Sequence, residues 1–320
     1  MNIGMKKLVV GVDIGGTLTK VGIADREGEV LANSQFPTQD YPDLGDYQRY
    51  LVQEIRTLER EISGPYELLG LGIGAPNANV YRGTIEHAAN LAWQGIVPFV
   101  EELSKLIELP IKITNDANAA AIGEKIYGNA ADMKDFIVIT LGTGLGSGIV
   151  SNGQMIYGHD SMAAELGHVV VDPNGRWTGL VQGGLEAYVS STGLKRTIFA
   201  LLAESMEDTP FRDVAYNDLH GEYITERAEQ GDPIALEAYE RTGKILGQHL
   251  ANFVAFSHPE AFFLLGGLAK SGKWIFEPTQ KYMEEALLPF YKGKVKLMAS
   301  GMTGKNAAIL GAAALIWEVQ

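Results

Sequence analysis

The chain has 320 residues, of which 46% are hydrophobic, and carries a formal net charge of −13 at pH 7. This length and apolar content suffice to bury two cores, so we expect two domains. The negative charge disfavours binding to nucleic acid and to anionic membrane surfaces. Because the sequence contains no cysteine, it excludes disulfides, thiolate metal sites and cysteine nucleophiles.

No apolar run in the sequence approaches the ~20 residues of a membrane-spanning helix, and the first one is broken early by Asp13 and two glycines. We therefore expect a cytoplasmic protein with no membrane partner. Lys292, Lys294 and Lys296 alternate along one short segment, which predicts the solvated face of a strand rather than a nucleic-acid site.

The first third of the chain alternates strands with helices. Leu8 to Asp13 is an apolar run that ends in an acid and a glycine pair, which predicts a buried strand. Residues 19–36 alternate through an Asp-Arg-Glu-Gly turn and predict a hairpin. Apolar side chains recur every three or four residues over 43–62, the spacing of a helix packed on a sheet. Two more strands and an intervening helix are predicted over residues 68–76, 111–116 and 98–109.

A second unit is predicted to begin at Phe136. The segment ITLGTGLGSGIVSNGQMI repeats the order of VDIGGTLTKVGIADREGEV, namely strand, glycine loop, strand, turn and strand. This predicts an internal duplication of supersecondary structure. Three further segments predict a long helix, a strand with a glycine turn, and a closing helix of small residues, over 232–256, 261–272 and 306–319. The alternation of strands and helices predicts an α/β class.

The motif DIGGT places Asp13, Gly15, Gly16 and Thr17 in a predicted tight turn between two strands. Glycines allow backbone N–H groups to approach anionic oxygens, and a neighbouring carboxylate can hold Mg²⁺ through water. The alternative is an ordinary hairpin turn with a structural aspartate.

The segment LGTGLGSG, residues 141–148, offers the same kind of loop. Two such loops in duplicated units predict a cleft that grips one polyphosphate from both sides. Gly266 and Gly267 form a third place where a ligand could come close to the backbone, here with the edge of an adenine or a ribose. The alternative there is a simple strand–helix turn.

Asn115 and Asp116 end a predicted strand, and a helix of small residues begins at Ala117. A carboxylate in this place can accept a proton from a hydroxyl nucleophile, while Asn115 can orient that hydroxyl. The alternative is that Asp116 is only a helix N-cap, which contributes ~1 kcal/mol to stability.

Five motifs in order, DIGGT, TNDANAAA, LGTGLGSGI, AAELGHVVVDPNG and GGLEAYVSSTGL, resemble those of the ROK family of sugar kinases and sugar-sensing repressors over essentially the whole chain. The segments NLAWQGIVPF and GGLEAYVSSTG resemble the glucokinase branch. The resemblance implies a two-domain actin-like, ribonuclease-H-like α/β fold with the active site in the interdomain cleft. It implies a small domain of residues 1–117 plus 303–320, a larger domain of 118–302, and a homodimer.

The resemblance also assigns site residues. Asp116 would be the general base and would contact the sugar with Asn115, while Asp13 would hold Mg²⁺ through water. The remaining sugar contacts would be Asn90, Glu165, His168 and Glu186. The ATP-binding residues would be Asp13, Gly15, Gly16 and Thr17 in the first loop, Gly142, Thr143, Gly144 and Gly146 in the second, and Gly266 and Gly267.

The sequence departs from the family where many members bind a structural zinc ion through a histidine and three cysteines. The matching positions here are Trp177, Gly179 and Gly184, so we expect no zinc, and His168 is left with the sugar alone. We expect Trp177, Leu180 and Val181 to replace the metal by apolar packing. The alternative for His168 is a core histidine with a satisfied hydrogen bond.

The predicted function is therefore ATP-dependent phosphorylation of a hexose at its 6-hydroxyl, with glucose as the expected substrate and sugar and nucleotide as small-molecule partners. Other substrates stay open: N-acetylglucosamine, N-acetylmannosamine, mannose and fructose. A non-catalytic sugar-sensing regulator is a rival, although such repressors carry a winged helix-turn-helix before the first loop and only twelve residues precede Asp13 here. A non-catalytic or ATP-hydrolysing actin-like protein is a third possibility. Polyphosphate also stays open as the donor.

Overall fold

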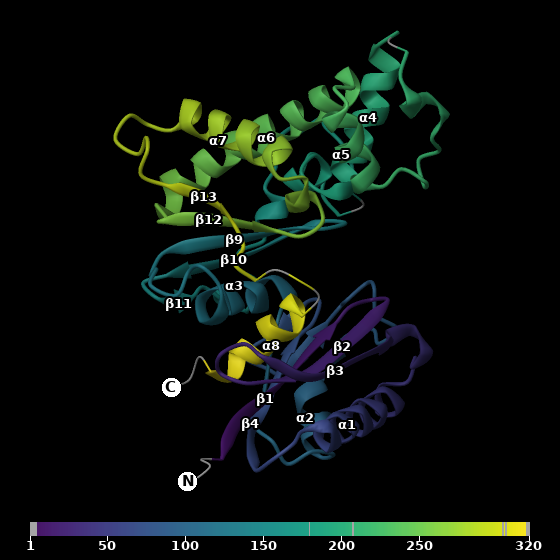
Figure 1. Cartoon of the computed structure of the whole chain (residues 1–320), viewed down its shortest axis with the longest axis vertical. Coiled ribbons are helices and arrows are strands. Elements are labelled where there is room, and N and C mark those ends of the chain that lie inside the picture. Colours follow the sequence, from purple (N-terminus) through teal and green to yellow (C-terminus); the bar gives the residue numbers. More distant parts are fainter. Residues whose placement is uncertain (1–4, 179, 207, 303, 305, 318–320) are drawn as a thin grey trace. The chain divides into compact units, whose positions relative to one another are not determined.

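The computed structural model describes residues 5–178, 180–206, 208–302, 304 and 306–317. The chain forms two compact units. The first unit comprises Met1–Met133, Gly148–Ala164 and Ser300–Gln320, and the second comprises Lys134–Ser147 and Glu165–Ala299. Figure 1 labels the α-helices and most of the strands.

The first sheet has the strand order β3-β2-β1-β4-β8. Strands β1 and β2 are antiparallel, as are β2 and β3, whereas β4 runs parallel to both β1 and β8. The predicted hairpin and strands are confirmed. Their bounds are β1 Lys6–Ile14, β2 Leu18–Ala24, β3 Val30–Pro37, β4 Tyr66–Gly74 and β8 Ile111–Thr114.

Alternate residues of β1 face two different cores, as the two-residue period of a strand requires. Leu8, Val10 and Val12 belong to the larger hydrophobic cluster, which includes the apolar stripe of α1 (Leu44–Glu61). Val9 belongs to a smaller cluster with Trp317 of α8 (Ala307–Trp317). The sheet is therefore covered on both faces, which explains the near-continuous apolar runs of its central strands.

The second sheet repeats the first, with strand order β11-β10-β9-β12-β13. Strands β10 and β11 are antiparallel, and β12 runs parallel to β9 and β13, so the order and these directions match the first sheet position by position. The predicted duplication is confirmed and extends to five strands. The bounds are β9 Phe136–Leu141, β10 Leu145–Ser151, β11 Gln154–Met155, β12 Ala261–Leu265 and β13 Lys296–Ala299.

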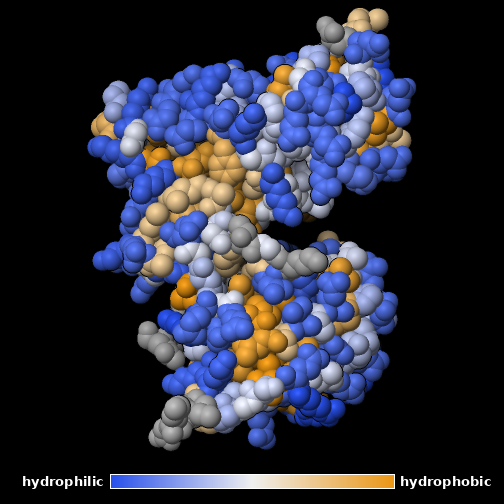
Figure 2. All heavy atoms as spheres, in the orientation of Figure 1, coloured by the Kyte–Doolittle hydropathy of each residue, from blue (hydrophilic) through white to orange (hydrophobic). Residues whose placement is uncertain are grey.

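Most of the second unit's helices were not predicted, apart from the long one, α6. Helix α6 (Pro233–Ser257) is capped by Asp232 and packs against α7 and α4. In Figure 2 the visible outer surface around α6 and α7 is largely hydrophilic. The helices missing from the sequence prediction are α4 Ser191–Glu204, α5 Gly221–Glu229 and α7 Lys273–Ala286.

Several predicted bounds were wrong. Helix α2 (Phe99–Ser104) ends well before residue 109, and Lys292 and Lys294 lie in a turn before β13, which only Lys296 enters. The sequence prediction also missed a small antiparallel sheet of β5 Ala78–Asn79, β6 Thr84–Glu86 and β7 Ile96–Val97. Strands of two or three residues are too short to give a readable alternation.

The first unit runs on past the predicted limit at residue 117, which lies inside α3 (Asp116–Tyr127). Helix α3 belongs to this unit because it packs against α8. The predicted return point, Thr303, and the last two residues predicted for the closing helix, Glu318 and Val319, lie outside the described residues. No helix in the described part of the chain combines the length and the apolar character needed to cross a membrane.

Candidate functional site

The first glycine loop is the tight turn between β1 and β2, as predicted. The Gly15 backbone N–H donates to the Leu18 carbonyl at 3.0 Å. A Cβ on Gly16 would lie 2.8 Å from the Asn90 carbonyl oxygen and 2.9 Å from its Cβ. The loop therefore rests directly on Asn90, and the close approach explains the glycine. The structure thus brings one predicted sugar-binding residue against the first predicted phosphate loop.

Asp13 pairs with a lysine that the sequence analysis did not single out. Asp13 and Lys20 are cross-strand partners on β1 and β2, and the Lys20 Nζ lies 3.4 Å from the Asp13 Oδ2. Burial raises the pKa of Asp13 above its ordinary value, Lys20 opposes this shift, and the charge of Asp116 adds to it. The pairing could have been found by counting residues outward from the turn, because antiparallel register fixes it.

The prediction that Asp13 holds Mg²⁺ through water stays a prediction, and the surroundings of Asp13 are compatible with it. The Asp13 side chain is 21% exposed, and the repulsion between Asp13 and Asp116 would be relieved by a cation near them. Mg²⁺ in such sites is held by one or two carboxylates, phosphates and waters. The described residues contain no cluster of three or more His, Asp or Glu side chains that could hold a metal ion.

Helix α3 begins with the predicted catalytic pair, and the two residues have different roles. The Asn115 side-chain oxygen accepts hydrogen bonds from the backbone N–H groups of Ala117 and Asn118 at 2.8 and 3.1 Å. Asn115 is therefore the N-cap, and the alternative that Asp116 is only the cap is wrong. The Asn115 oxygen is committed to the helix, which leaves its amide nitrogen as the group that can contact a ligand.

Asp116 is the first residue of α3 and is exposed to solvent. Its Oδ1 accepts the Ala117 N–H at 2.9 Å. Surrounding protein raises the pKa of Asp116 by desolvation, and backbone hydrogen bonds oppose the shift. Because the side chain still reaches solvent, the carboxylate is both accessible to a substrate and a stronger base than an ordinary aspartate.

The second glycine loop holds Glu186. The Leu145 N–H donates to the Glu186 Oε2 at 2.8 Å, and the Gly146 N–H donates to the Thr140 hydroxyl at 3.2 Å. A Cβ on Gly144 would lie 2.2 Å from the Glu186 Oε2, whereas one on Gly142 would meet nothing within 4 Å. One predicted sugar-binding carboxylate is thus anchored to the second predicted phosphate loop.

Glu165 and His168 lie beside Glu186 on a second turn. The 3₁₀-helix η2 (Leu166–His168) places the His168 Nε2 3.7 Å from the Glu165 Oε2. The His168 side chain is 33% exposed, and its buried Nδ1 has no hydrogen-bond partner. The alternative of a satisfied core histidine is therefore wrong. The Leu185 N–H donates to the Val169 carbonyl at 2.9 Å, which joins η2 to the turn η3 (Leu185–Ala187).

A cavity of about 560 Å³ opens beside Gly267. Gly266 has a φ of +102°, and Gly267 leads into the 3₁₀-helix η5 (Leu268–Ser271). The Ser191 N–H donates to the Gly142 carbonyl at 2.8 Å, so the cavity wall is joined to the second glycine loop. The cavity is lined by Ser191, Leu194, His220, Gly221, Glu222, Thr225, Glu226, Glu229, Gly267, Leu268, Lys270 and Ser271.

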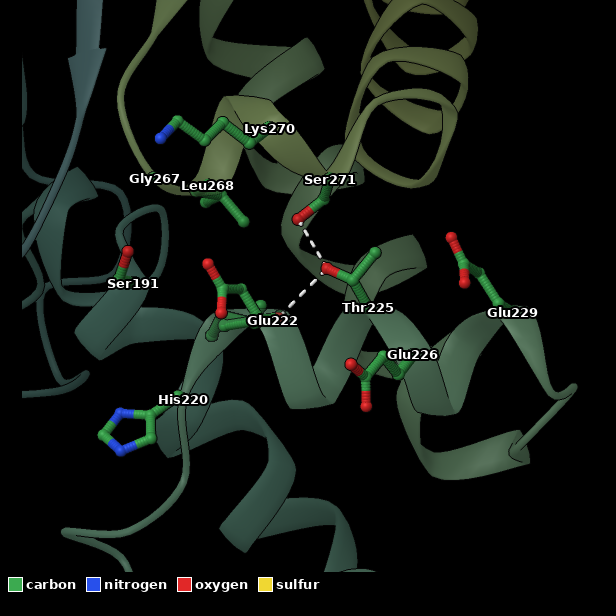
Figure 3. A pocket seen from close by; sticks show the side chains of 12 residues that line it. Ser191, His220, Glu222, Thr225, Glu226, Glu229, Gly267, Leu268, Lys270 and Ser271 are labelled. Atoms are coloured by element: carbon green, nitrogen blue, oxygen red, sulfur yellow. Dashed lines mark hydrogen bonds between the residues drawn. The ribbon is translucent and has the colours of Figure 1, made fainter. Parts of the chain in front are cut away.

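Figure 3 shows the Glu222 carboxylate reaching from α5 toward Leu268, and the Thr225 hydroxyl bonded to Ser271 at 3.1 Å. Glu226 and Glu229 follow Glu222 on the same helix and also line the cavity. Only the glycine edge of this cavity was predicted from the sequence, because α5 was not predicted.

The family model described as ROK family matches residues 9–319. The chain belongs to the ROK family. A glucokinase from Streptomyces coelicolor is 32% identical, covering 97% of this chain and 98% of its own. The structure of a ROK family glucokinase from Streptomyces griseus with glucose and AMPPNP matches with a TM-score of 0.79 and 30% identity, covering 96% of this chain and 98% of that one. A putative xylose repressor from Caldicellulosiruptor is 26% identical over 97% of this chain and 78% of its own.

The ROK family membership confirms the predicted fold class, the two-domain actin-like, ribonuclease-H-like α/β fold. The two sheets of identical strand order are the duplicated halves of that fold. The roles of the individual residues stay predictions.

The prediction of no structural zinc rests on residues 177, 179 and 184 and stays a prediction. Trp177 and Gly184 have no metal-binding side chain, and Gly179 lies outside the described residues. The predicted apolar packing is wrong for Trp177 and Leu180, which are 59% and 75% exposed, and only Val181 is half-buried. The loop closes instead through backbone pairing, with a bridge between Trp177 and Gln182 and a hydrogen bond from the Gly183 N–H to the Arg176 carbonyl at 2.7 Å.

Proposed function

We propose that this ROK protein is a sugar kinase that transfers the γ-phosphoryl group of ATP to the 6-hydroxyl of a hexose, with glucose as the preferred acceptor. The observation that carries the proposal is the start of α3. There Asn115 caps the helix and leaves Asp116 exposed, with a pKa raised by its surroundings. A carboxylate of raised basicity that a substrate can reach is suited to general base catalysis.

In this mechanism, the sugar 6-oxygen forms a bond to the γ-phosphorus while the bond between that phosphorus and the β,γ-bridging oxygen breaks. Asp116 accepts the proton from the 6-hydroxyl, and the leaving ADP keeps the bonding electrons. Asn115 orients the attacking hydroxyl through its amide nitrogen. The other sugar hydroxyls are bound by Asn90, Glu165, His168 and Glu186.

Catalysis of phosphoryl transfer depends mainly on positioning and on stabilising the phosphate charge. Backbone N–H groups of the two glycine loops would supply fixed dipoles for that purpose. Mg²⁺ held near Asp13 would neutralise part of the phosphate charge. Lys20, which faces Asp13, would contribute a second positive charge at the first loop.

The cavity beside Gly267 supports a nucleotide as the donor. Carboxylates such as Glu222 accept hydrogen bonds from ribose hydroxyls, and Leu268 offers an apolar surface to a base. Inorganic polyphosphate would instead meet three carboxylates, those of Glu222, Glu226 and Glu229, against the single positive charge of Lys270. The cavity therefore favours ATP over polyphosphate.

The relatives support a hexose acceptor. Glucokinases are 31–32% identical over nearly the whole chain, compared with 25–26% for the xylose repressors. A regulator that binds sugar without phosphorylating it is the second candidate, because the repressors match almost the same share of this chain.

The deciding experiment is a coupled assay of ADP release with MgATP across a panel of hexoses and N-acetylhexosamines, run beside the Asp116→Ala variant. We expect turnover with glucose and a loss of about 100-fold or more in the variant. Turnover retained within tenfold in Asp116→Ala would contradict the role of the base. If no sugar of the panel supports ADP release while calorimetry shows that ATP and sugar still bind, the result would favour a regulator that binds sugar without phosphorylating it.

A further inference from the structure

The middle of the loop between His168 and Glu186 is not anchored by large apolar side chains. Trp177 and Leu180 are exposed to solvent, whereas Leu185, at the end of the loop, is buried. Fixing the backbone of such a loop costs conformational entropy at every residue. A specific set of contacts must therefore hold it, and these contacts centre on Arg176.

The Arg176 side chain reaches three oxygen atoms outside its own loop. Its Nη1 lies 3.3 Å from the Ala187 carbonyl oxygen, 3.2 Å from that of Gly193 and 3.0 Å from the Thr197 hydroxyl. Ala187 ends η3, and the other two residues lie in the first two turns of α4. One guanidinium thus ties the loop to both of the elements that follow it.

The backbone of Arg176 is held as firmly as its side chain. The Arg176 N–H donates to the Tyr188 hydroxyl at 2.9 Å, and its carbonyl accepts the Gly183 N–H at 2.7 Å. The guanidinium carbon lies 4.8 Å from the centre of the Tyr188 ring, within the range of a cation–π contact. A Cβ on Gly175 would collide with the Tyr188 hydroxyl, so the loop is packed closely around this tyrosine.

The surroundings of Arg176 are unfavourable to its charge, apart from these contacts. Burial lowers the pKa of Arg176, and the charges of Arg196 and Arg241 act in the same direction, whereas Tyr188 and Glu204 oppose the shift. No ion pair with a carboxylate holds Arg176 in the described part of the chain. A half-buried guanidinium that serves backbone carbonyls has the geometry of a clamp rather than of a surface charge.

The clamp acts on both predicted sugar-binding turns. Ala187, whose carbonyl receives the guanidinium, directly follows Glu186. The Gly183 N–H donates to the Arg176 carbonyl, and the next residue, Gly184, forms a β-bridge with Val170. Val170 lies two residues after His168. Displacement of Arg176 would therefore release the segments on either side of the site.

We propose that Arg176 is the positioning residue that orients His168 and Glu186 for the sugar. Its guanidinium closes the loop onto η3 and α4 and holds the two turns together. The inference about sugar binding rests on the proposed function, whereas the inference about the loop does not.

The test compares the full-length protein with Arg176→Met, Arg176→Lys and a control, Arg212→Met. Arg212 also donates to two backbone carbonyls of the second unit, those of Leu202 and Ser205, but at a distance along the chain from the two turns. Three quantities are measured: the glucose Kd by calorimetry without ATP, KM and kcat in the coupled assay, and amide hydrogen exchange over residues 169–187.

For Arg176→Met we expect the glucose Kd and KM to rise about tenfold or more, with the KM for ATP within about twofold of the wild type. Exchange at 169–187 should accelerate by at least about tenfold. Arg176→Lys should recover part of both effects, and Arg212→Met should show neither.

The proposal is overturned if exchange over 169–187 is unchanged in Arg176→Met, or if Arg212→Met changes it equally. It is also overturned if the loop loosens while the glucose Kd stays at the wild-type value. A wild-type protein that neither binds nor phosphorylates any sugar of the panel would refute the proposed function and the orienting role for sugar. The exchange data would then still decide whether Arg176 holds the loop.

Discussion

Replacement of Gly144 by alanine should damage sugar binding through Glu186, although neither Gly144 nor its new methyl group would need to touch the sugar. The added Cβ would lie 2.2 Å from the Glu186 Oε2 and 2.9 Å from its carboxyl carbon. Van der Waals contact between carbon and oxygen requires about 3.2–3.5 Å. The carboxylate must therefore move by about 1 Å, because Gly144 belongs to a backbone loop that is less free to move.

That displacement breaks the 2.8 Å hydrogen bond from the Leu145 N–H to the Glu186 Oε2. A hydrogen bond to a charged group contributes about 1.5–3 kcal/mol, which corresponds to roughly 10- to 100-fold in an equilibrium constant. Glu186 is partly exposed, so water can replace some of the lost bond, and the lower end of this range is expected. We predict that the glucose KM rises about tenfold in Gly144→Ala.

Gly142→Ala in the same loop is the matched control. A Cβ there would meet nothing within 4 Å, and Gly142 does not have a positive φ, so the fold should accept it. If the loop binds phosphate through its backbone, the new methyl group would raise the KM for ATP and leave that for glucose unchanged. The coupled assay with each substrate varied in turn measures both values. An unchanged glucose KM in Gly144→Ala, with the protein folded, would refute the reasoning about Glu186.

Four more predictions test the first unit and the cavity. The pKa of Asp116 is raised, and the base must be ionised to act. The plot of kcat/KM against pH should therefore rise with its midpoint above 3.8, the ordinary pKa of an aspartate. The native state binds this proton more tightly than the unfolded chain, so the contribution of Asp116 to stability falls as pH rises from 3.8 through the raised pKa. Asp116→Asn should then raise the melting temperature at pH 7 while reducing kcat; a lower melting temperature would contradict the sign. Asn115→Ala should lower the free energy of unfolding in urea by about 1 kcal/mol, since two capping bonds are lost, and Asn115→Asp, which keeps the capping oxygen, is the control. Glu222→Gln should raise the KM for ATP by about fivefold and leave that for glucose unchanged; equal KM values for ATP in the two proteins would exclude a role for Glu222 in binding the ribose.

The sequence alone determined the local elements whose signals are strong. The DIGGT turn, the hairpin over 19–36, helices α1 and α6 and the duplicated order of strands all follow from apolar periodicity and glycine placement, which act over a few residues. The ordered motifs also determined the family, because five of them in the right order leave little room for coincidence. Asp116 and Asn115 were found in the same way, from their position between a strand and a helix.

The tertiary structure decided which oxygen each side chain uses and what holds each loop. Asn115 rather than Asp116 caps α3, and Glu186 is anchored to the second glycine loop. The register between β1 and β2 brings Lys20 to Asp13, and Arg176 takes the place that Trp177 and Leu180 were expected to fill. These contacts join residues that are far apart in sequence or depend on how a loop folds back. A single sequence carries no periodic signal for such contacts, because their energy appears only when distant segments pack together.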